Sequence, residues 1–293
     1  MKQRLLRLDD GRKLAIEMSG PEDGHVLLWH DGTPGSSYQL AHVADAAHVR
    51  GLRLITMSRA GYTGSTRAAG RSVADVVPDS SAVLDALGVD DALVGGVSGG
   101  GPHALACAAL LGGRARATAA VCSVAPYDAD GLDFLAGMGQ DNVEEFGLAL
   151  EGERRLRPYL EQQLPALAAA TPAELVQTMA TLLPDIDRRC LTGPVGDDFA
   201  AAMASTAAGG ADGWVDDDLA FTRPWGFALS EIRGPVSLWQ GSEDLMVPFS
   251  HGQWLAEHIP GVQAHLETGQ GHLSINVGSI DRILDELISG ARH

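Results

Sequence analysis

The chain of 293 residues has little lysine and no long apolar run, and each shortage excludes a class of partner. Lys2 and Lys13 are its only lysines, and 38 acidic residues against 21 basic ones give a formal net charge of −17. Such a surface repels nucleic acid and anionic lipid, so we expect neither as a partner. No segment approaches the run of about 18 apolar residues that a membrane-spanning helix needs.

Cysteine is also scarce, which argues against a disulfide framework. The three cysteines are Cys107, Cys122 and Cys190, an odd number without close spacing. The first two lie among Ala and Val, which predicts buried free thiols and a reducing compartment. The amino-terminal stretch MKQRLLRLDDGRKLA reaches acidic residues before any long apolar core, unlike a secretory signal. We therefore expect a cytoplasmic protein.

Ligand patterns for metals and nucleotides are missing as well. No set of His, Cys and Asp has a metal-ligand spacing such as H-E-x-x-H. The one conspicuous glycine run, from Gly95 to Gly101, does not match a dinucleotide or phosphate fingerprint. We expect neither a metal nor a cofactor.

Strand and helix patterns alternate along most of the chain. Two short alternating segments, 3–8 and 12–20, flank the turn sequence DDG and predict a hairpin. Further strands are expected at 25–30, 52–59, 91–98, 115–126, 235–241 and 262–269. Helices are expected at 39–51, 72–89 with an interruption at Pro78, 102–113, 248–259 and 277–291. This order predicts an α/β fold with a mostly parallel, doubly wound sheet of about eight strands.

The alternation stops after Pro126. Residues 127–230 contain helical patterns such as 142–164 and 171–183 but no strand run, and prolines, glycines and the acidic DGWVDDDL break up the rest. We predict a helical cap at 127–230, inserted after the sixth strand, between core parts 1–126 and 231–293.

The glycine run surrounds one serine. In LVGGVSGGGPHALA, the residues Gly96 to Gly100 match G-x-S-x-G between a predicted strand and a predicted helix. In such a tight turn the serine has a strained backbone, and its neighbours two residues away must be small. The turn would lift the Ser98 hydroxyl above the carboxyl edge of the sheet, where ligands of open α/β sheets bind.

A serine hydroxyl is a weak nucleophile unless a base and an orienting acid accompany it. Asp244, in GSEDLMVP, follows the strand 235–241, and His272, in GQGHLS, follows the strand 262–269 in a loop before the next helix. The order Ser, Asp, His is that of α/β-hydrolases. Alternative acids follow the strand that ends at Pro126, in less suitable positions: Asp128, Asp130 and Asp133.

Four separated motifs, HDGTPGS, SRAGYTGS, GGVSGG and the pair GSEDLMVP with GQGHLS, carry a resemblance. The chain resembles the α/β-hydrolase fold superfamily, and within it the capped serine hydrolases that include proline iminopeptidases, esterases and lactonases. The resemblance implies Ser98 as nucleophile, His272 as general base and acid, and Asp244 as its orienting carboxylate. It also implies an oxyanion hole made by the backbone N–H groups of Gly99 and Thr33.

Two charged residues accompany these motifs. Asp31 occupies the place where such hydrolases usually have histidine, and a carboxylate there would oppose an oxyanion. We predict that Asp31 faces outward or pairs with a cation. Arg59, in SRAGYTGS, is predicted to satisfy backbone carbonyls or a carboxylate beneath the site rather than to act in catalysis.

Other polar and aromatic residues have a structural interpretation beside a functional one. His30 and His103 are expected to be structural. The cap acids Glu144 and Glu145 either bind the amine of a substrate or form a solvated helix face. Four cap aromatics either line an apolar pocket or pack in the core: Trp214, Phe221, Trp225 and Phe227.

These residues predict a serine hydrolase that cleaves an ester, lactone or small amide of a small-molecule acyl substrate. Carbon–carbon bond hydrolysis, hydroxynitrile cleavage and perhydrolysis use the same triad and stay open. A serine at position 98 argues against dehalogenase and epoxide hydrolase chemistry, which use aspartate there. The alternatives are an iminopeptidase-like aminopeptidase and a non-catalytic binding protein of the same fold. The sequence does not decide whether the protein forms a homo-oligomer.

Overall fold

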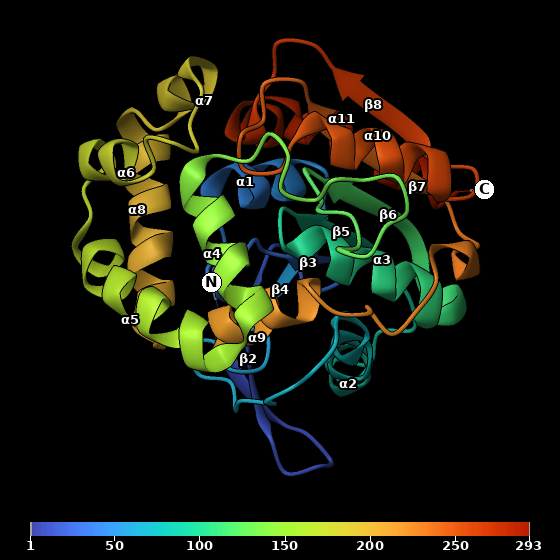
Figure 1. The fold of residues 1–293 in the computed structure, drawn as a ribbon. Coiled ribbons are helices and arrows are strands. Elements are labelled where there is room, and N and C mark those ends of the chain that lie inside the picture. Colours follow the sequence, from blue (N-terminus) through green and yellow to red (C-terminus); the bar gives the residue numbers. More distant parts are fainter. Residues whose placement is uncertain (1, 293) are drawn as a thin grey trace.

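A single sheet of eight strands forms the centre of the computed structural model, which describes residues 2–292 (Figure 1). The order across the sheet is β1-β2-β4-β3-β5-β6-β7-β8. The strands are β1 (Lys2–Arg7), β2 (Lys13–Ser19), β3 (Val26–His30), β4 (Arg53–Met57), β5 (Ala92–Val97), β6 (Ala115–Val121), β7 (Val236–Gly241) and β8 (Gln263–Glu267). β2 pairs antiparallel with β1 and with β4, and all other pairs are parallel. The predicted mostly parallel sheet and its hairpin are confirmed.

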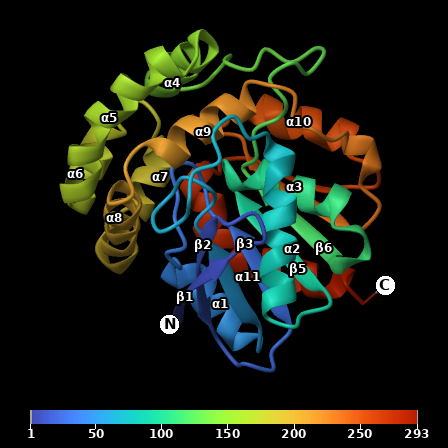
Figure 2. The same ribbon diagram turned by 90° about the horizontal axis from the view of Figure 1, so that it is seen from below.

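Helices cover both faces of this sheet (Figure 2). One face is covered by α1 (Ala41–Val49) and α11 (His272–Gly290). The other face is covered by α2 (Val76–Ala86), α3 (Gly100–Leu110) and α10 (Phe249–His258). The central strands β3, β5 and β7 are buried along their whole length, as their continuous apolar sequences require.

Between β6 and β7 the chain forms helices only, among the residues that the structure describes. They are α4 (Gln140–Glu151), α5 (Glu153–Ala169), α6 (Pro172–Thr178), α7 (Asp185–Cys190), α8 (Gly193–Ala207), α9 (Asp212–Phe221) and the short 3-10 helix η3 (Leu229–Glu231). We call residues 122–235 the helical segment. In Figure 1 its helices α4 to α8 lie to the left of the sheet, over the strand ends. The division of the chain at 127 and 230 stays a prediction.

Two predicted helices differ from the structure in where they are interrupted. Pro78 does not interrupt a helix: a 3-10 turn, η1 (Val73–Asp75), comes first, and Pro78 falls in the first turn of α2, where its missing N–H is not needed. The pattern 142–164 is two helices, because Gly152 has φ 95° and ends α4 before α5 begins. Glycine adopts this left-handed backbone without steric cost.

The acidic stretch DGWVDDDL is another correction, because it forms α9 instead of breaking the structure. Every residue from Gly213 to Phe221 is buried, including Asp216, Asp217 and Asp218. A local pattern of three carboxylates predicts a solvated loop, whereas partners from distant parts of the chain make the buried helix stable.

The cysteines and the apolar segments agree with expectation. Cys107 and Cys122 are buried free thiols, as predicted, and Cys190 is a half-buried free thiol. Within residues 2–292, no helix has the length and apolar character that crossing a membrane would take.

Candidate active site

Ser98 lies in the sharp turn between β5 and α3. Its φ is 55°, a left-handed conformation that residues with side chains rarely adopt. Glycines make the turn feasible: a Cβ at Gly96 would collide with the Gly100 carbonyl, and one at Gly100 would collide with the carbonyls of His30 and Asp31. The predicted strained turn, with obligatory small residues on each side of the serine, is confirmed in geometry.

The histidine and the aspartate of the predicted triad are hydrogen bonded to each other. His272 Nδ1 lies 2.7 Å from Asp244 Oδ2, and both side chains are buried. The other oxygen of Asp244 accepts hydrogen bonds from the N–H groups of Met246 (2.9 Å) and Val247 (2.8 Å). Because these backbone N–H groups fix the orientation of the Asp244 carboxylate, the carboxylate can hold the imidazole in one orientation. The alternative acids Asp128, Asp130 and Asp133 are exposed.

The surroundings of His272 favour its protonated form. Burial by itself lowers the pKa of the ring, but the charge and hydrogen bond of Asp244 and the more distant charge of Asp187 outweigh burial and raise it above the ordinary value. His272 is also the first residue of α11, not a loop residue as predicted. A base at this position is therefore positioned by a helix backbone.

Two pockets meet at Ser98. The larger chamber has a volume of about 190 Å³, and its walls include Ser98, Gly99 and Trp214. The smaller chamber, of about 140 Å³, is lined by Ser98 and by His272. The structure thus brings Ser98 and His272 to one pocket. Among residues 2–292, no hydrogen bond joins the Ser98 hydroxyl to the His272 ring.

Gly99 and Thr33 lie against each other beside the serine. A Cβ at Gly99 would collide with the side chain of Thr33. Gly32, the residue before Thr33, lies close to the Ser98 side chain. In the described part of the chain, neither the Gly99 nor the Thr33 N–H donates a hydrogen bond to a protein atom. The two residues predicted as oxyanion donors therefore lie in contact, and their N–H groups have no acceptor within residues 2–292.

The prediction for Asp31 is wrong. The residue is half-buried and lines the smaller chamber instead of facing outward. Arg59 binds its main-chain carbonyl (Nη1 to O, 2.6 Å), and no ion pair of the described residues includes its carboxylate. Burial raises the pKa of Asp31 to about 7, although the charge of Arg59 opposes the rise. Near neutral pH the group is therefore partly uncharged, which reduces its repulsion of an oxyanion.

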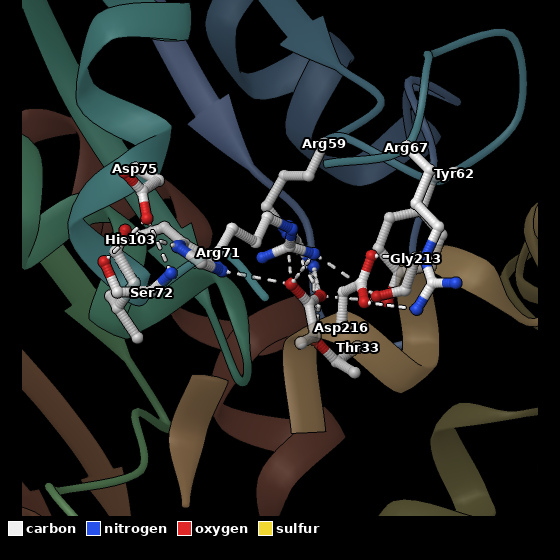
Figure 3. A network of polar contacts seen from close by, with 12 residues as sticks. Thr33, Arg59, Tyr62, Arg67, Arg71, Ser72, Asp75, His103, Gly213 and Asp216 are labelled. Atoms are coloured by element: carbon white, nitrogen blue, oxygen red, sulfur yellow. Dashed lines mark hydrogen bonds and ion pairs between the residues drawn. The ribbon is translucent and has the colours of Figure 1, made fainter. Parts of the chain in front are cut away.

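A buried polar network connects the loop of Thr33 to α9 (Figure 3). Asp217, fully buried on α9, accepts hydrogen bonds from Thr33 Oγ1 (2.7 Å) and Tyr62 Oη (2.9 Å). The guanidinium groups of Arg59 and Arg71 bind the same carboxylate. Although burial raises the pKa of Asp217, these two charges lower it well below the usual range, so the group is ionised.

Arg59 uses its remaining donors on the loop itself. Besides the carbonyl of Asp31, its Nη2 reaches the carbonyl of Gly32 at 2.7 Å and Thr33 Oγ1 at 3.1 Å. The predicted structural role of Arg59 is confirmed, with both of the expected partner types. Arg67 binds the neighbouring Asp216 in the same way, through two hydrogen bonds of 2.9 Å and 2.7 Å. The sequence prediction missed Asp216 and Asp217, although the three arginines in 59–71 against the three consecutive aspartates at 216–218 were a usable signal.

The other predicted residues divide into three groups. His30 and His103 are buried, and His103 lies 3.3 Å from Asp217. Trp214 and Phe221 line the larger chamber together with Glu145. Three residues lie outside both chambers: Trp225, Phe227 and Glu144.

One group of side chains has the proximity of metal ligands. The ligand atoms of Cys122, Asp244 and His272 lie within 4.8 Å of one another. Burial, with the charge of Asp244, raises the pKa of the Cys122 thiol well above its usual value. Because the thiolate is the form that binds metals, a protonated Cys122 does not favour a metal here.

Comparison with known proteins identifies the family of the chain. The family model for the alpha/beta hydrolase fold matches residues 25–278, so the chain belongs to that family. No curated protein sequence matches the chain.

Solved structures show the same fold over the whole chain. The structure is similar to an alpha/beta hydrolase fold protein from Nakamurella multipartita, with 24% identity, a TM-score of 0.71 and 100% of each chain covered. It is also similar to an enol-lactonase from Burkholderia xenovorans, with 16% identity, a TM-score of 0.65 and coverage of 98% of this chain and 100% of that one. A thermophilic esterase from Thermogutta terrifontis has 17% identity, a TM-score of 0.69 and 100% of each chain covered.

The turn at Ser98 predicts an unequal effect of two glycine substitutions. Gly100→Ala should lower the free energy of unfolding by about 2 to 3 kcal/mol, because its Cβ overlaps backbone carbonyls that cannot move. The control is Gly113→Ala, whose Cβ would meet no atom within 4 Å. Urea unfolding of both variants checks this, and equal midpoints would contradict the assigned turn geometry.

The buried network predicts a pH-dependent effect at Asp217. Asp217→Asn should cost about 3 kcal/mol or more in unfolding free energy, because it leaves Arg59 and Arg71 without their shared charge. Since the folded state lowers the pKa of Asp217, the carboxylate stabilises the fold above about pH 4, and this is lost as the pH falls further.

The measurement is unfolding free energy against pH for wild type and variant. The difference should be constant at neutral pH and shrink in acid. Asp281→Asn, which removes a 73%-exposed partner of Arg50, is the control and should cost less than about 1 kcal/mol. A similar, pH-independent loss in both variants would refute the network.

Proposed function

We propose that the protein is a serine hydrolase that cleaves an ester, lactone or small amide. The observation that carries the proposal is the buried pair His272–Asp244, with 2.7 Å between Nδ1 and Oδ2, in the pocket that Ser98 lines from its strained turn. The esterase and the lactonase among the structural relatives support an ester substrate. We also propose that the helical segment acts as the cap over this pocket.

The reaction has two steps. Ser98 Oγ attacks the carbonyl carbon while its proton passes to His272 Nε2, and the imidazolium is stabilised by Asp244. The carbonyl oxygen, now negative, binds the N–H groups of Gly99 and Thr33. His272 then gives the proton to the leaving group as its bond to carbon breaks, which leaves an acyl-enzyme. Water, deprotonated by His272, attacks the acyl carbon; His272 then returns the proton to Ser98 Oγ as the bond from Oγ to carbon breaks, which releases the acid.

The two chambers assign the two halves of the substrate. Because His272 must protonate the leaving group, that group belongs on the side of His272, in the smaller chamber. The acyl group then occupies the larger chamber, against Trp214 and Phe221. Both volumes are small, which favours a small-molecule substrate over a long polymer.

A fluorophosphonate probe tests the nucleophile. We expect covalent labelling of the wild type at Ser98 and its loss in Ser98→Ala, together with a fall of about 10⁴-fold or more in turnover of p-nitrophenyl esters. The matched control, Ser230→Ala, changes an exposed serine and should behave as wild type. Well-folded wild type that does not label would favour the non-catalytic binding protein instead.

The pH dependence of the same reaction tests the base. Only unprotonated His272 accepts the proton of Ser98, so kcat/KM should fall as the pH drops through the pKa of His272. Since the folded state raises that pKa, the half-maximal point should lie above about pH 6.5. A rate that stays constant down to pH 5 would exclude His272 as the base.

A second candidate, an aminopeptidase of the iminopeptidase type, is favoured by two acids in the larger chamber. Asp218 is buried, and neither of its oxygens has a hydrogen-bond donor among the described residues. Glu145 lines the same chamber and accepts from Trp214 Nε1 at 2.8 Å. Burial and the charge of Glu145 raise the pKa of Asp218 well above its usual range. We infer that the ammonium group of a substrate replaces the proton that the Asp218 and Glu145 carboxyl groups hold.

Paired substrates separate the two candidates. The leading proposal expects turnover of p-nitrophenyl acyl esters, and turnover of a prolyl anilide alone would show that ester hydrolysis is the wrong class. If an amine is bound, Asp218→Asn should raise KM for the anilide at least about tenfold and leave neutral esters unchanged. The control is Glu144→Gln, which alters an exposed neighbour outside the chamber.

A further inference from the structure

Asp187 is a buried acid of the helical segment that the proposed chemistry does not use. It belongs to the short helix α7 and has no exposed surface. Its Oδ2 accepts the N–H of His272 at 2.7 Å, and its Oδ1 accepts the N–H of Ser274 at 2.8 Å. The carboxylate therefore binds the backbone of the residue that carries the proposed base.

These two N–H groups belong to the first turn of α11. Within that turn the Ser274 hydroxyl accepts the N–H of Gly271 at 2.8 Å, but among the described residues no side chain of α11 accepts the two N–H groups themselves. The N-cap residue is Gly271, so a carboxylate from elsewhere can occupy the position that a Ser or Asp usually fills. A Cβ at Gly271 would lie 2.5 Å from both oxygens of Asp187. Glycine at this position provides the room for the distant carboxylate, and the helix dipole favours its charge.

Apolar contacts hold α7 at this position. Leu183 and Leu191, on either side of α7, pack with Leu273, the residue that follows His272. Leu191 also lines the smaller chamber, where we place the leaving group. One part of the helical segment therefore contacts both the substrate space and the start of α11.

We propose that Asp187 is a positioning residue for His272, supplied by the helical segment and required for the base to face Ser98. This inference rests on the proposed function, in which His272 moves the proton of Ser98. Asp244 fixes the ring through Nδ1, and Asp187 fixes the backbone through the N–H of the same residue. A displaced or reshaped helical segment would thus change the rate of the chemical step, as well as substrate affinity.

Steady-state kinetics of Asp187→Asn test this positioning role. The variant keeps one acceptor and loses the charge. We expect kcat on a p-nitrophenyl ester to fall about 10- to 100-fold with KM changed less than about twofold, because the base is misplaced while the chambers remain. Thr171→Ala removes the exposed N-cap of α6 in the same segment and is the control for a capping bond lost away from His272, with unchanged kcat.

A second pair of variants keeps the charge and moves the carboxylate. Gly271→Ala should lower kcat because its Cβ displaces Asp187, whereas the same change in the Asp187→Ala background meets no carboxylate and should cost nothing further. Equal kcat losses from Gly271→Ala in both backgrounds would overturn the proposal, as would wild-type kcat in Asp187→Asn.

An NMR titration of the His272 ring tests the contact between Asp187 and His272 without an activity measurement. The groups that face the ring are Asp244, Asp187 and Cys122, with Asp31 lining the same chamber. In Asp187→Asn the midpoint should move to lower pH by about 0.5 unit or more, because one nearby negative charge is lost. The shift should persist in the Asp31→Asn background.

An unchanged midpoint would contradict the proposal. If the wild type fails to label with fluorophosphonate, the proposed function is wrong, and the titration still decides whether Asp187 controls His272.

Discussion

Ser98 has a left-handed backbone conformation, with φ 55°. The residues beside it are glycine at positions where a Cβ would collide with backbone atoms. Such a conformation costs on the order of 1 to 3 kcal/mol, so other contacts must hold it. The N–H of Ser98 donates to the carbonyl of Val121 at 2.8 Å, and Gly101 donates to the carbonyl of Ser98 at 2.9 Å. The hydroxyl is thereby fixed where two chambers meet, and every proposed step of the reaction depends on that placement.

The helical segment contributes buried carboxylates to both sides of this site. Asp217 binds the arginine that holds the Thr33 loop, and Asp187 binds the first turn of the helix that begins at His272. A buried charge is stable only with a full set of donors, which both groups have. Among the described residues, neither oxygen of Asp218, the direct neighbour of Asp217, has a hydrogen-bond donor. This contrast within one helix separates an acid fixed by its partners from the acid that we propose as available to a substrate amine.

The sheet, its hairpin and the motif residues were predictable, because strand patterns and tight turns depend on local sequence. Ser98, Asp244 and His272 follow the ends of β5, β7 and β8, and parallel strands bring those ends to one edge. What could not be predicted depends on contacts between distant segments. The acidic run of α9 forms a buried helix only because arginines more than a hundred residues earlier neutralise it. The start of α11 at His272 likewise depends on Asp187, 85 residues earlier.

The most direct test of the central claim is a crystal structure of the protein after reaction with a small alkyl fluorophosphonate. Hydrolysis by Ser98 with His272 requires phosphorus bonded to Ser98 Oγ, with one phosphonyl oxygen in hydrogen-bond distance of the Gly99 and Thr33 N–H groups. His272 Nε2 must then lie within reach of Ser98 Oγ or the leaving-group oxygen. An adduct on another residue, or a phosphonyl oxygen that faces away from both N–H groups, would contradict the proposed chemistry.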